Sequence, residues 1–111
     1  MIRVTCFLRP HKLEEVKTAI ADIGVGGMTV NDVRGRGNSA EQASLLGGNV
    51  MALPVRSKLT VVVEDADKAE LVVQAILENA GTGAPGDGKI FLEPIEDAIR
   101  IRTGESGPEA V

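Results

Sequence analysis

The stretch TGAPGDGKIF, residues 82–91, sets glycines, an aspartate and a lysine directly before an apolar pair. Gly83, Gly88 and Lys89 come close to the spacing of a P-loop, but Ile90 stands where a P-loop has the Ser or Thr that holds Mg²⁺. The flanks are also reversed, because a helix-like segment precedes the stretch and a strand-like segment follows it. The stretch is therefore either a phosphate-binding loop of another kind or only a turn.

The alternating segment AIRIR, residues 98–102, is a second candidate for anion chemistry. Arg100 and Arg102 would leave one face of a short strand, and Lys89 would add a third cation nearby in the expected sheet. Gly86 and Gly88 would let backbone N–H groups turn toward an anion. In a chain of net charge −4, this gathering of cations favours phosphate binding. The alternative is that both arginines pair with surface carboxylates.

The composition argues against several other kinds of site. The net charge of −4 gives no reason to expect nucleic-acid or membrane-surface binding, and the absence of Trp and Tyr removes the usual aromatic stacking platforms. Cys6 and His11 are the only residues of their types, so we expect no internal disulfide and no metal site. Without a visible signal peptide or membrane-length apolar run, we expect a cytoplasmic protein with no direct membrane insertion.

Hydrophobic periodicity predicts the elements that must position these residues. We expect helices over 12–23, ended by Gly24, and from the N-cap Asp65 to about residue 80, and strands over 2–9, 28–34, 58–64, 89–93 and 98–102. The last residues, SGPEAV, are expected to be mobile. The order strand, helix, strand, strand, helix, strand, with a short C-terminal strand, is the α+β, ferredoxin-like βαββαβ pattern.

This pattern leaves one face of the sheet without helices. Val61, Val63 and the apolar side chains of the first strand indicate that the sheet is apolar enough for a partner subunit to cover that face.

The connection between the second and third strands is long. Residues 35–54 are twenty residues without clear periodicity, whereas a hairpin needs only two to five loop residues. A connection of this length inside a compact domain is usually functional or disordered. A wrongly placed strand is the alternative, but the segments on both sides have good strand patterns.

The motifs PGDGKIF (85–91) and AIRIRTGE (98–105), at this spacing, closely resemble the PII family of signal-transduction proteins. The resemblance covers residues 1–37 and 58–105. It implies a single PII-like domain over 1–111 that assembles as a homotrimer. In it, the T-loop (about 36–55) inserts into or blocks partner proteins. The B-loop (about 82–89) and C-loop (about 100–105) contribute to clefts between subunits that bind ATP or ADP.

The resemblance also implies which residues bind the nucleotide. Phe7 and Val62 would sandwich the purine, with Phe7 larger than the family's aliphatic residue, and Thr29 would help to read the base. The full set that matches the family pattern is Phe7, Thr29, Gly35, Arg36, Gly37, Asn38, Val62, Gly86, Asp87, Gly88, Lys89, Arg100 and Arg102.

The sequence departs from the family pattern at the effector site. Asn38-Ser39 replaces the usual Arg-Gln, whose glutamine helps to coordinate Mg²⁺ with ATP and 2-oxoglutarate. Arg56 replaces a lysine that pairs with an effector carboxylate. We therefore expect Ser39 and Arg56 to support only weak 2-oxoglutarate binding, or none, even when Mg²⁺ accompanies ATP. The chain also lacks the tyrosine that is uridylylated in many bacterial members.

The loop itself is unusually apolar for a partner-binding loop. Its segment SLLGGNVMALPV, residues 44–55, places apolar side chains around a Gly-Gly hinge, and those expected to meet a partner are Leu45, Leu46, Val50 and Met51. Disorder alone accounts for the glycines but not for the leucines. An apolar pocket on a partner, or the protein's own trimer, would suit such a loop.

Three functions fit these observations. The first is a trimeric sensor of ATP and ADP that controls a transporter, enzyme or transcription factor through its T-loop, in nitrogen or related metabolism. The second is a PII-like paralogue that senses another small effector for carbon or transport control. The third, a nucleotide hydrolase, lacks a placed general base, because His11 lies away from the expected phosphates. We therefore predict a regulator without catalytic residues.

Overall fold

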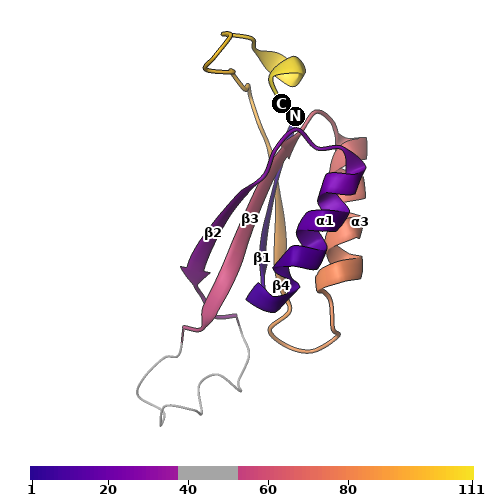
Figure 1. The fold of residues 1–111 in the computed structure, drawn as a ribbon, viewed down its shortest axis with the longest axis vertical. Coiled ribbons are helices and arrows are strands. Elements are labelled where there is room, and N and C mark those ends of the chain that lie inside the picture. The colour runs from indigo at the N-terminus through magenta and orange to yellow at the C-terminus, as the bar shows by residue number, and fades with distance from the viewer. Residues whose placement is uncertain (38–52) are drawn as a thin grey trace.

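The computed structural model describes residues 1–37 and 53–111, and Figure 1 shows the arrangement of its elements. In chain order these are β1 (Ile2–Leu8), η1 (Pro10–Lys12), α1 (Leu13–Ile23), β2 (Thr29–Arg34), β3 (Val55–Val63), α3 (Ala66–Ala80), β4 (Gly88–Pro94) and η2 (Gly107–Ala110). The predicted βαββαβ order is confirmed, and so is the long connection between β2 and β3. Strand β3 begins three residues earlier than its pattern suggested, at Val55.

The four strands form one antiparallel sheet in the order β2-β3-β1-β4. Across its middle, Thr5 lies opposite both Thr60 and Phe91, and Thr60 lies opposite Thr29. The backbone N–H of Gly35 donates to the carbonyl of Pro54 at 3.1 Å, which closes the β2–β3 hairpin at the base of its connection. The start of the connection and its end are therefore held side by side.

Both helices pack on the same face of the sheet (Figure 1), and the core lies between these two layers. The alternation read from the first strand is confirmed, because Val4, Cys6 and Leu8 are all at most 1% exposed. Burial raises the pKa of the Cys6 thiol to about 11, so it stays protonated as a small core side chain. The other buried apolar residues are Val16, Ile20, Leu59, Val61, Val63, Ala69, Val72, Ala75, Ile76 and Ala80.

The reasoning that placed apolar valines on the uncovered face of the sheet was wrong. Val61 and Val63 are 2% and 1% exposed and belong to the core beneath the helices. Side chains alternate along a strand, so the opposite face carries their neighbours instead. That face is lined by Arg3, Thr5, Phe7, Lys58, Thr60, Phe91 and Glu93. It is mixed in character rather than apolar.

The predicted ends of the two helices are confirmed. Gly24 follows α1 with φ of 90°, a left-handed conformation that glycine adopts without the penalty of a side chain. Asp65 caps α3, because its carboxylate accepts a hydrogen bond from the backbone N–H of Lys68 at 2.9 Å. Both signals are local to the sequence, which explains why they could be read from it.

The predicted fifth strand is wrong, because residues 98–102 lead into a tight reversal. The N–H of Arg100 donates to the carbonyl of Glu105 at 2.8 Å, and that of Gly104 donates to the carbonyl of Arg100 at 2.8 Å. Only an isolated bridge joins Ile99 to Ser106. Alternating residues form a strand only where a neighbouring strand pairs with them, and the described residues provide none here.

The C-terminal residues also differ from the expectation that SGPEAV is mobile. They contain η2, and the N–H of Gly107 donates to the carbonyl of Ala98 at 3.0 Å and to the carboxylate of Asp97 at 2.9 Å. The N–H of Val111 donates to the carbonyl of Pro108 at 3.3 Å. These bonds tie the end of the chain to the segment that follows β4.

Candidate functional site

The loop between α3 and β4 is organised around the carboxylate of Asp87. One oxygen, Oδ2, accepts from the N–H groups of Thr82 at 2.7 Å and Gly83 at 2.9 Å. The other, Oδ1, accepts from the hydroxyl of Thr82 and from Nη1 of Arg9 at 2.6 Å. Arg9 also donates through Nη1 to the Thr82 hydroxyl at 3.2 Å and through Nη2 to the carbonyl of Pro85 at 2.7 Å. We call these three residues, Arg9, Thr82 and Asp87, the loop clasp.

These contacts change the acidity of Asp87. Hydrogen bonds from the Thr82 side chain and backbone, together with those from Gly83 and the charge of Arg9, lower the pKa of Asp87 to about 2. The carboxylate therefore remains ionised at any pH near neutrality. Both of its oxygens accept hydrogen bonds from within the chain, so Asp87 shapes the loop.

The two glycines of the GDG motif are required for different reasons. A Cβ atom at Gly88 would lie 1.7 Å from the carbonyl oxygen of Phe7, and φ at Gly88 is 112°. At Gly86, where φ is 95°, a Cβ would lie 2.9 Å from Nη2 of Arg9. Gly88 thus lets β4 begin directly against β1, and Gly86 lets the loop pass close to a guanidinium. Each glycine is needed by the fold itself, whether or not an anion is bound.

A cleft of about 450 Å³ opens at this end of the sheet. It brings together eight of the residues predicted from the sequence, contributed by β1, by the start of the long connection, by β3, by the loop before β4 and by the first residues of β4. They are Phe7, Gly35, Arg36, Gly37, Arg56, Gly86, Gly88 and Lys89, with Phe91 as a further lining residue. This volume is within the range of small-molecule sites.

The charges around the cleft are unbalanced. Arg36, Arg56 and Lys89 all line it, and none forms an ion pair with a carboxylate of residues 1–37 or 53–111. The Nε atom of Arg36 is buried and has no hydrogen-bond partner within those residues. The N–H group of Gly86 likewise donates to no acceptor in the described part of the chain. The cleft thus offers several donors suited to an anion.

Two phenylalanines give the cleft an apolar wall. The rings of Phe7 and Phe91 meet edge to face, with centroids 6.1 Å apart, and Nζ of Lys58 lies 5.9 Å from the Phe7 centroid. Phe91 is 47% exposed, so a large part of its surface is free to contact a ligand or another chain. An aromatic wall beside a cationic floor matches the needs of a base attached to phosphates.

Thr29 and Val62 lie on the same face of the sheet as Phe7 but not in this cleft. Phe7 pairs with Lys58, and Val62 is four positions further along β3, opposite Arg3. At the usual rise of a strand this separates Phe7 from Val62 by about 13 Å. One chain therefore does not enclose a purine between them, and the predicted purine sandwich stays a prediction about a cleft between subunits.

Arg100 and Arg102 lie at the other end of the molecule. The 82–87 loop is at the foot of the sheet in Figure 1, and the segment that follows β4 is at its top. Strand β4, whose residues 88–94 span about 20 Å, separates the two. The prediction that Lys89 and both arginines gather in one chain is wrong, because β4 carries the chain away from the loop.

Arg100 already has a partner in its own chain. Its Nη1 lies 3.2 Å from Oε1 of Glu105, and its Nη2 donates to the carbonyl of Glu109 at 3.3 Å. The alternative weighed from the sequence, pairing with a surface carboxylate, therefore describes Arg100 here. Arg102 is exposed and forms no ion pair within the described ranges.

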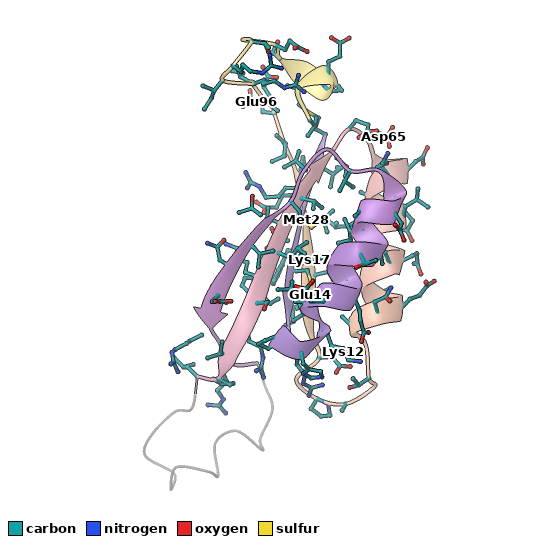
Figure 2. All side chains as sticks on the ribbon, in the orientation of Figure 1. Lys12, Glu14, Lys17, Met28, Asp65 and Glu96 are labelled. Carbon is teal, nitrogen blue, oxygen red and sulfur yellow. The ribbon has the colours of Figure 1, made fainter. Side chains whose placement is uncertain are left out.

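Figure 2 helps to locate both ends, because Lys12 marks the end with the cleft and Glu96 marks the end with the C-terminal segment. The remaining predicted residues lie outside the described part of the chain. These are Asn38 and Ser39 at the effector site and Leu45, Leu46, Val50 and Met51 in the expected T-loop.

Three residues of the site were missed by reasoning from the sequence: Arg9, Thr82 and Phe91. Arg9 lies 78 positions from Asp87, and no local pattern links the two. Phe91 was predicted only as part of a strand. Because side chains alternate along a strand, its position two residues after Lys89 would have placed the Phe91 and Lys89 side chains on the same face. Thr82 precedes Asp87 by five residues, a spacing that carries no signal until the loop is folded.

Metal-ligand groups and membrane-spanning helices were both considered for the residues that the structure describes. No group of three or more His, Cys, Asp or Glu side chains in that part of the chain is arranged to hold a metal ion. No helix there is both long enough and apolar enough to cross a bilayer.

The fold and the cleft together define a small α+β protein with a cleft lined by cations at one end of an antiparallel sheet. A family model described as nitrogen regulatory protein P-II matches residues 1–105. The chain is 45% identical over 112 residues to the nitrogen regulatory protein P-II of Nostoc punctiforme and 42% identical over 114 residues to that of Haemophilus influenzae. It is also 44% identical over 114 residues to nitrogen regulatory protein P-II 2 of Methanothermobacter thermautotrophicus.

These alignments cover 100% of the chain and 97% or more of each relative. The chain therefore belongs to the P-II family of nitrogen regulatory proteins, as the GDGKIF and RIRTGE motifs indicated. Membership makes it a nitrogen regulatory signal-transduction protein and not an enzyme. The resemblance read from residues 1–37 and 58–105 extends to the whole length.

Proposed function

We propose that this P-II protein is a trimeric sensor of ATP and ADP that controls a partner protein through the T-loop, residues 36–55. The observation that carries the proposal is the cleft beside Lys89, with its aromatic wall and with cations that pair with no carboxylate of residues 1–37 or 53–111. Polyphosphate oxygens would meet Arg36, Lys89 and the N–H groups of Gly86 and Asp87. The base would lie toward the aromatic wall of Phe7 and Phe91.

The separation of the two cationic ends supports an assembly of several chains. In one chain Lys89 and Arg102 lie at opposite ends of β4, so a single nucleotide cannot touch both. A ring in which the cleft end of one subunit meets the C-terminal end of the next would bring them together. Such head-to-tail contacts close into cyclic oligomers when the rotation between subunits allows it. In this arrangement Val62 of a neighbour would also complete the purine pocket.

The first test measures assembly and affinity. Light scattering should give about three times the 11.6 kDa mass of one chain, and calorimetry should show ADP and ATP binding. Lys89→Ala and Arg102→Ala should each weaken ADP by about 1.5–3 kcal/mol, the value of a charge-assisted contact. A monomer at micromolar concentration would contradict the shared cleft, and unchanged affinity in Lys89→Ala would show that the GDGKIF loop is only a turn.

A second test decides whether one cleft uses two chains. Lys89→Ala and Arg102→Ala chains are mixed after unfolding and then refolded together. In mixed trimers about a quarter of the clefts would combine an intact Lys89 with an intact Arg102 from the neighbour. Recovery of tight ADP sites in the mixture supports the shared cleft. No recovery beyond the separate variants would contradict a cleft shared between two chains.

We also infer that 2-oxoglutarate binds weakly or not at all. Arg56 lines the cleft, and its Nη1 donates to the carbonyl of Val55 at 3.0 Å, which leaves the rest of its guanidinium for one carboxylate contact. A single exposed contact contributes little, and Ser39 is too short to replace a glutamine amide at a metal ion. Calorimetry with ATP, Mg²⁺ and 2-oxoglutarate tests this. Asn38→Arg with Ser39→Gln should gain binding, and tight binding by the unmodified chain would contradict the inference.

A further inference from the structure

The loop clasp joins segments that are far apart in the sequence. One guanidinium, that of Arg9 beyond the end of β1, contacts the carboxylate of Asp87, the hydroxyl of Thr82 and the carbonyl of Pro85. The side chains of Arg9 and Asp87 are only 25% and 24% exposed, so this ion pair is better shielded from water than the chain's surface pairs. Such a set of contacts fixes a loop more firmly than a single surface ion pair does.

The charge of the clasp makes it a poor anion binder. Asp87 neutralises Arg9, and a carboxylate at the border of the cleft repels an incoming phosphate. Attraction for an anion falls instead to Arg36, Arg56 and Lys89, which lack carboxylate partners among the described residues. If Asp87 affected binding through its charge alone, it would weaken binding.

The clasp does determine where the donors of the loop lie. Arg9 packs so closely on Gly86 that a Cβ at this position would come within 2.9 Å of Nη2 of Arg9. The same Cβ would be 3.8 Å from Nη2 of Arg56, a cation of the cleft. The N–H groups of Gly86 and Asp87 and the first residues of β4, including Lys89, follow directly from this point. Their positions therefore depend on the contacts of Arg9 and Asp87.

We propose that Arg9, Thr82 and Asp87 are positioning residues for the anion cleft, and that nucleotide affinity requires them although Asp87 carries the charge that opposes an anion. The identity of the ligand in this proposal rests on the proposed function. The clasp itself rests on the hydrogen bonds and the ion pair within the chain. It acts by holding N–H groups and Lys89 in place before the ligand arrives, which lowers the ordering cost of binding.

The sign of one substitution separates positioning from charge. Asp87→Asn keeps the shape of the side chain but removes its charge, and its amide nitrogen cannot accept the hydrogen bonds that one carboxylate oxygen now accepts. Coulomb attraction alone predicts that ADP binds this variant more tightly than the unmodified protein. Positioning predicts binding weaker by about tenfold, the loss expected for a displaced charge-assisted contact. Calorimetry with ADP at constant salt measures the difference.

Two further substitutions keep the charge constant. Arg9→Lys preserves the cation but replaces the fork that reaches three acceptors with a single ammonium, so ADP should bind about three- to tenfold more weakly. Thr82→Ser preserves the hydroxyl and should bind as the unmodified protein does. Thr82→Val preserves the shape without the hydroxyl and should weaken ADP about threefold or more. If residue 82 acted only by filling space, Thr82→Ser would not bind ADP more tightly than Thr82→Val.

A matched control removes an ion pair elsewhere. Lys17 and Glu14 pair at 3.0 Å on the outside of α1, so Glu14→Gln removes a charge and a contact without touching the cleft. Its ADP affinity should equal that of the unmodified protein. Because a helix-surface pair contributes little to stability, this variant should also fold normally.

Amide hydrogen exchange in the ligand-free trimer provides a readout that needs no nucleotide. The N–H groups of Thr82 and Gly83 donate to Asp87, so they should exchange faster in Asp87→Ala, which has no side-chain acceptor, and at an unchanged rate in Glu14→Gln. If the unmodified protein failed to bind ADP, the proposed function would be wrong, and this exchange would still decide whether the clasp holds the loop. Unchanged exchange, or ADP binding in Asp87→Asn at least as tight as in the unmodified protein, would overturn the proposal.

Discussion

The two ends of the sheet are built from similar residues but are held in different ways. At the cleft end, Asp87 uses both carboxylate oxygens to close the 82–87 loop. At the C-terminal end, Asp97 uses one oxygen, Oδ1, to accept from the N–H groups of Ala98 and Gly107. Each end therefore reverses the chain around an aspartate. At the cleft end, Arg9, which lies just beyond the end of β1, also clamps the reversal from a distant part of the sequence.

The cations of the two ends also differ, because a carboxylate already pairs with one of them at the C-terminal end. At the cleft end, Arg36, Arg56 and Lys89 have no carboxylate partner in the described ranges, whereas Arg100 at the C-terminal end is paired with Glu105. A basic motif in a sequence does not show which of its charges are already compensated. Phosphate affinity within one chain should therefore reside at the cleft end, and under the proposed function the C-terminal end would contribute only after assembly.

The largest expected contrast is between two glycines with positive φ. Gly88→Ala should lower the free energy of unfolding by about 3 kcal/mol or more, because the new Cβ would overlap the Phe7 carbonyl oxygen. Gly104→Ala, at the C-terminal reversal, meets no atom within 4 Å and should cost only about 1–2 kcal/mol for the left-handed backbone. Urea unfolding followed by far-UV circular dichroism, at equal protein concentration, compares them. Equal losses would mean that the close approach of β4 to β1 is not a constraint.

The next contrast concerns pH. Because its contacts favour the ionised form, Asp87 has a pKa of about 2 instead of the ordinary 3.8. The stabilisation from these contacts is therefore complete above pH 3.8 and is lost as the pH falls through about 2. The carboxyl ¹³C shift of Asp87 should remain that of a carboxylate at pH 3, and Thr82→Val should move its midpoint toward 3.8. A titration midpoint of 3.8 for Asp87 in the unmodified protein would show that the clasp contacts do not stabilise its carboxylate.

A smaller effect separates the two aspartates. Both bonds to Asp97 end on a single oxygen, so an asparagine can accept them, and Asp97→Asn should be close to neutral. Asp97→Ala removes both bonds and should make local opening easier by about 1 kcal/mol. Hydrogen exchange of the Gly107 amide measures this opening. Slower exchange in Asp97→Ala than in Asp97→Asn would contradict the role of that oxygen.

The smallest effect is expected from the ion pair of the C-terminal end. The side chains of Arg100 and Glu105 are 38% and 43% exposed, so solvent screens their attraction. Glu105→Gln should change the free energy of unfolding by about 0.5 kcal/mol or less. A double-mutant cycle with Arg100→Met, measured by urea unfolding, isolates the pair. If a matching cycle on Arg9 and Asp87 gave no larger coupling than this one, the two ends would not differ in how firmly their ion pairs hold them.

Much of the fold was determined by sequence alone. Alternation in β1, the spacing of apolar residues in α1 and α3, and the signals at Gly24 and Asp65 all depend on neighbours within a few residues. Such patterns reflect local backbone geometry and are visible without a structure. The GDGKIF and RIRTGE motifs indicated the P-II family for the same reason, because each is a short run of adjacent residues.

The tertiary structure decided which of these residues act together. It separated Lys89 from Arg100 and Arg102, because β4 is extended and carries the chain to the far end of the sheet. It joined Arg9 to Asp87 across 78 positions, through the pairing of β1 with β4. Strand register, chain reversal and ion pairing depend on contacts between distant segments. No periodicity records such contacts, so the sequence could name the candidate residues but not group them.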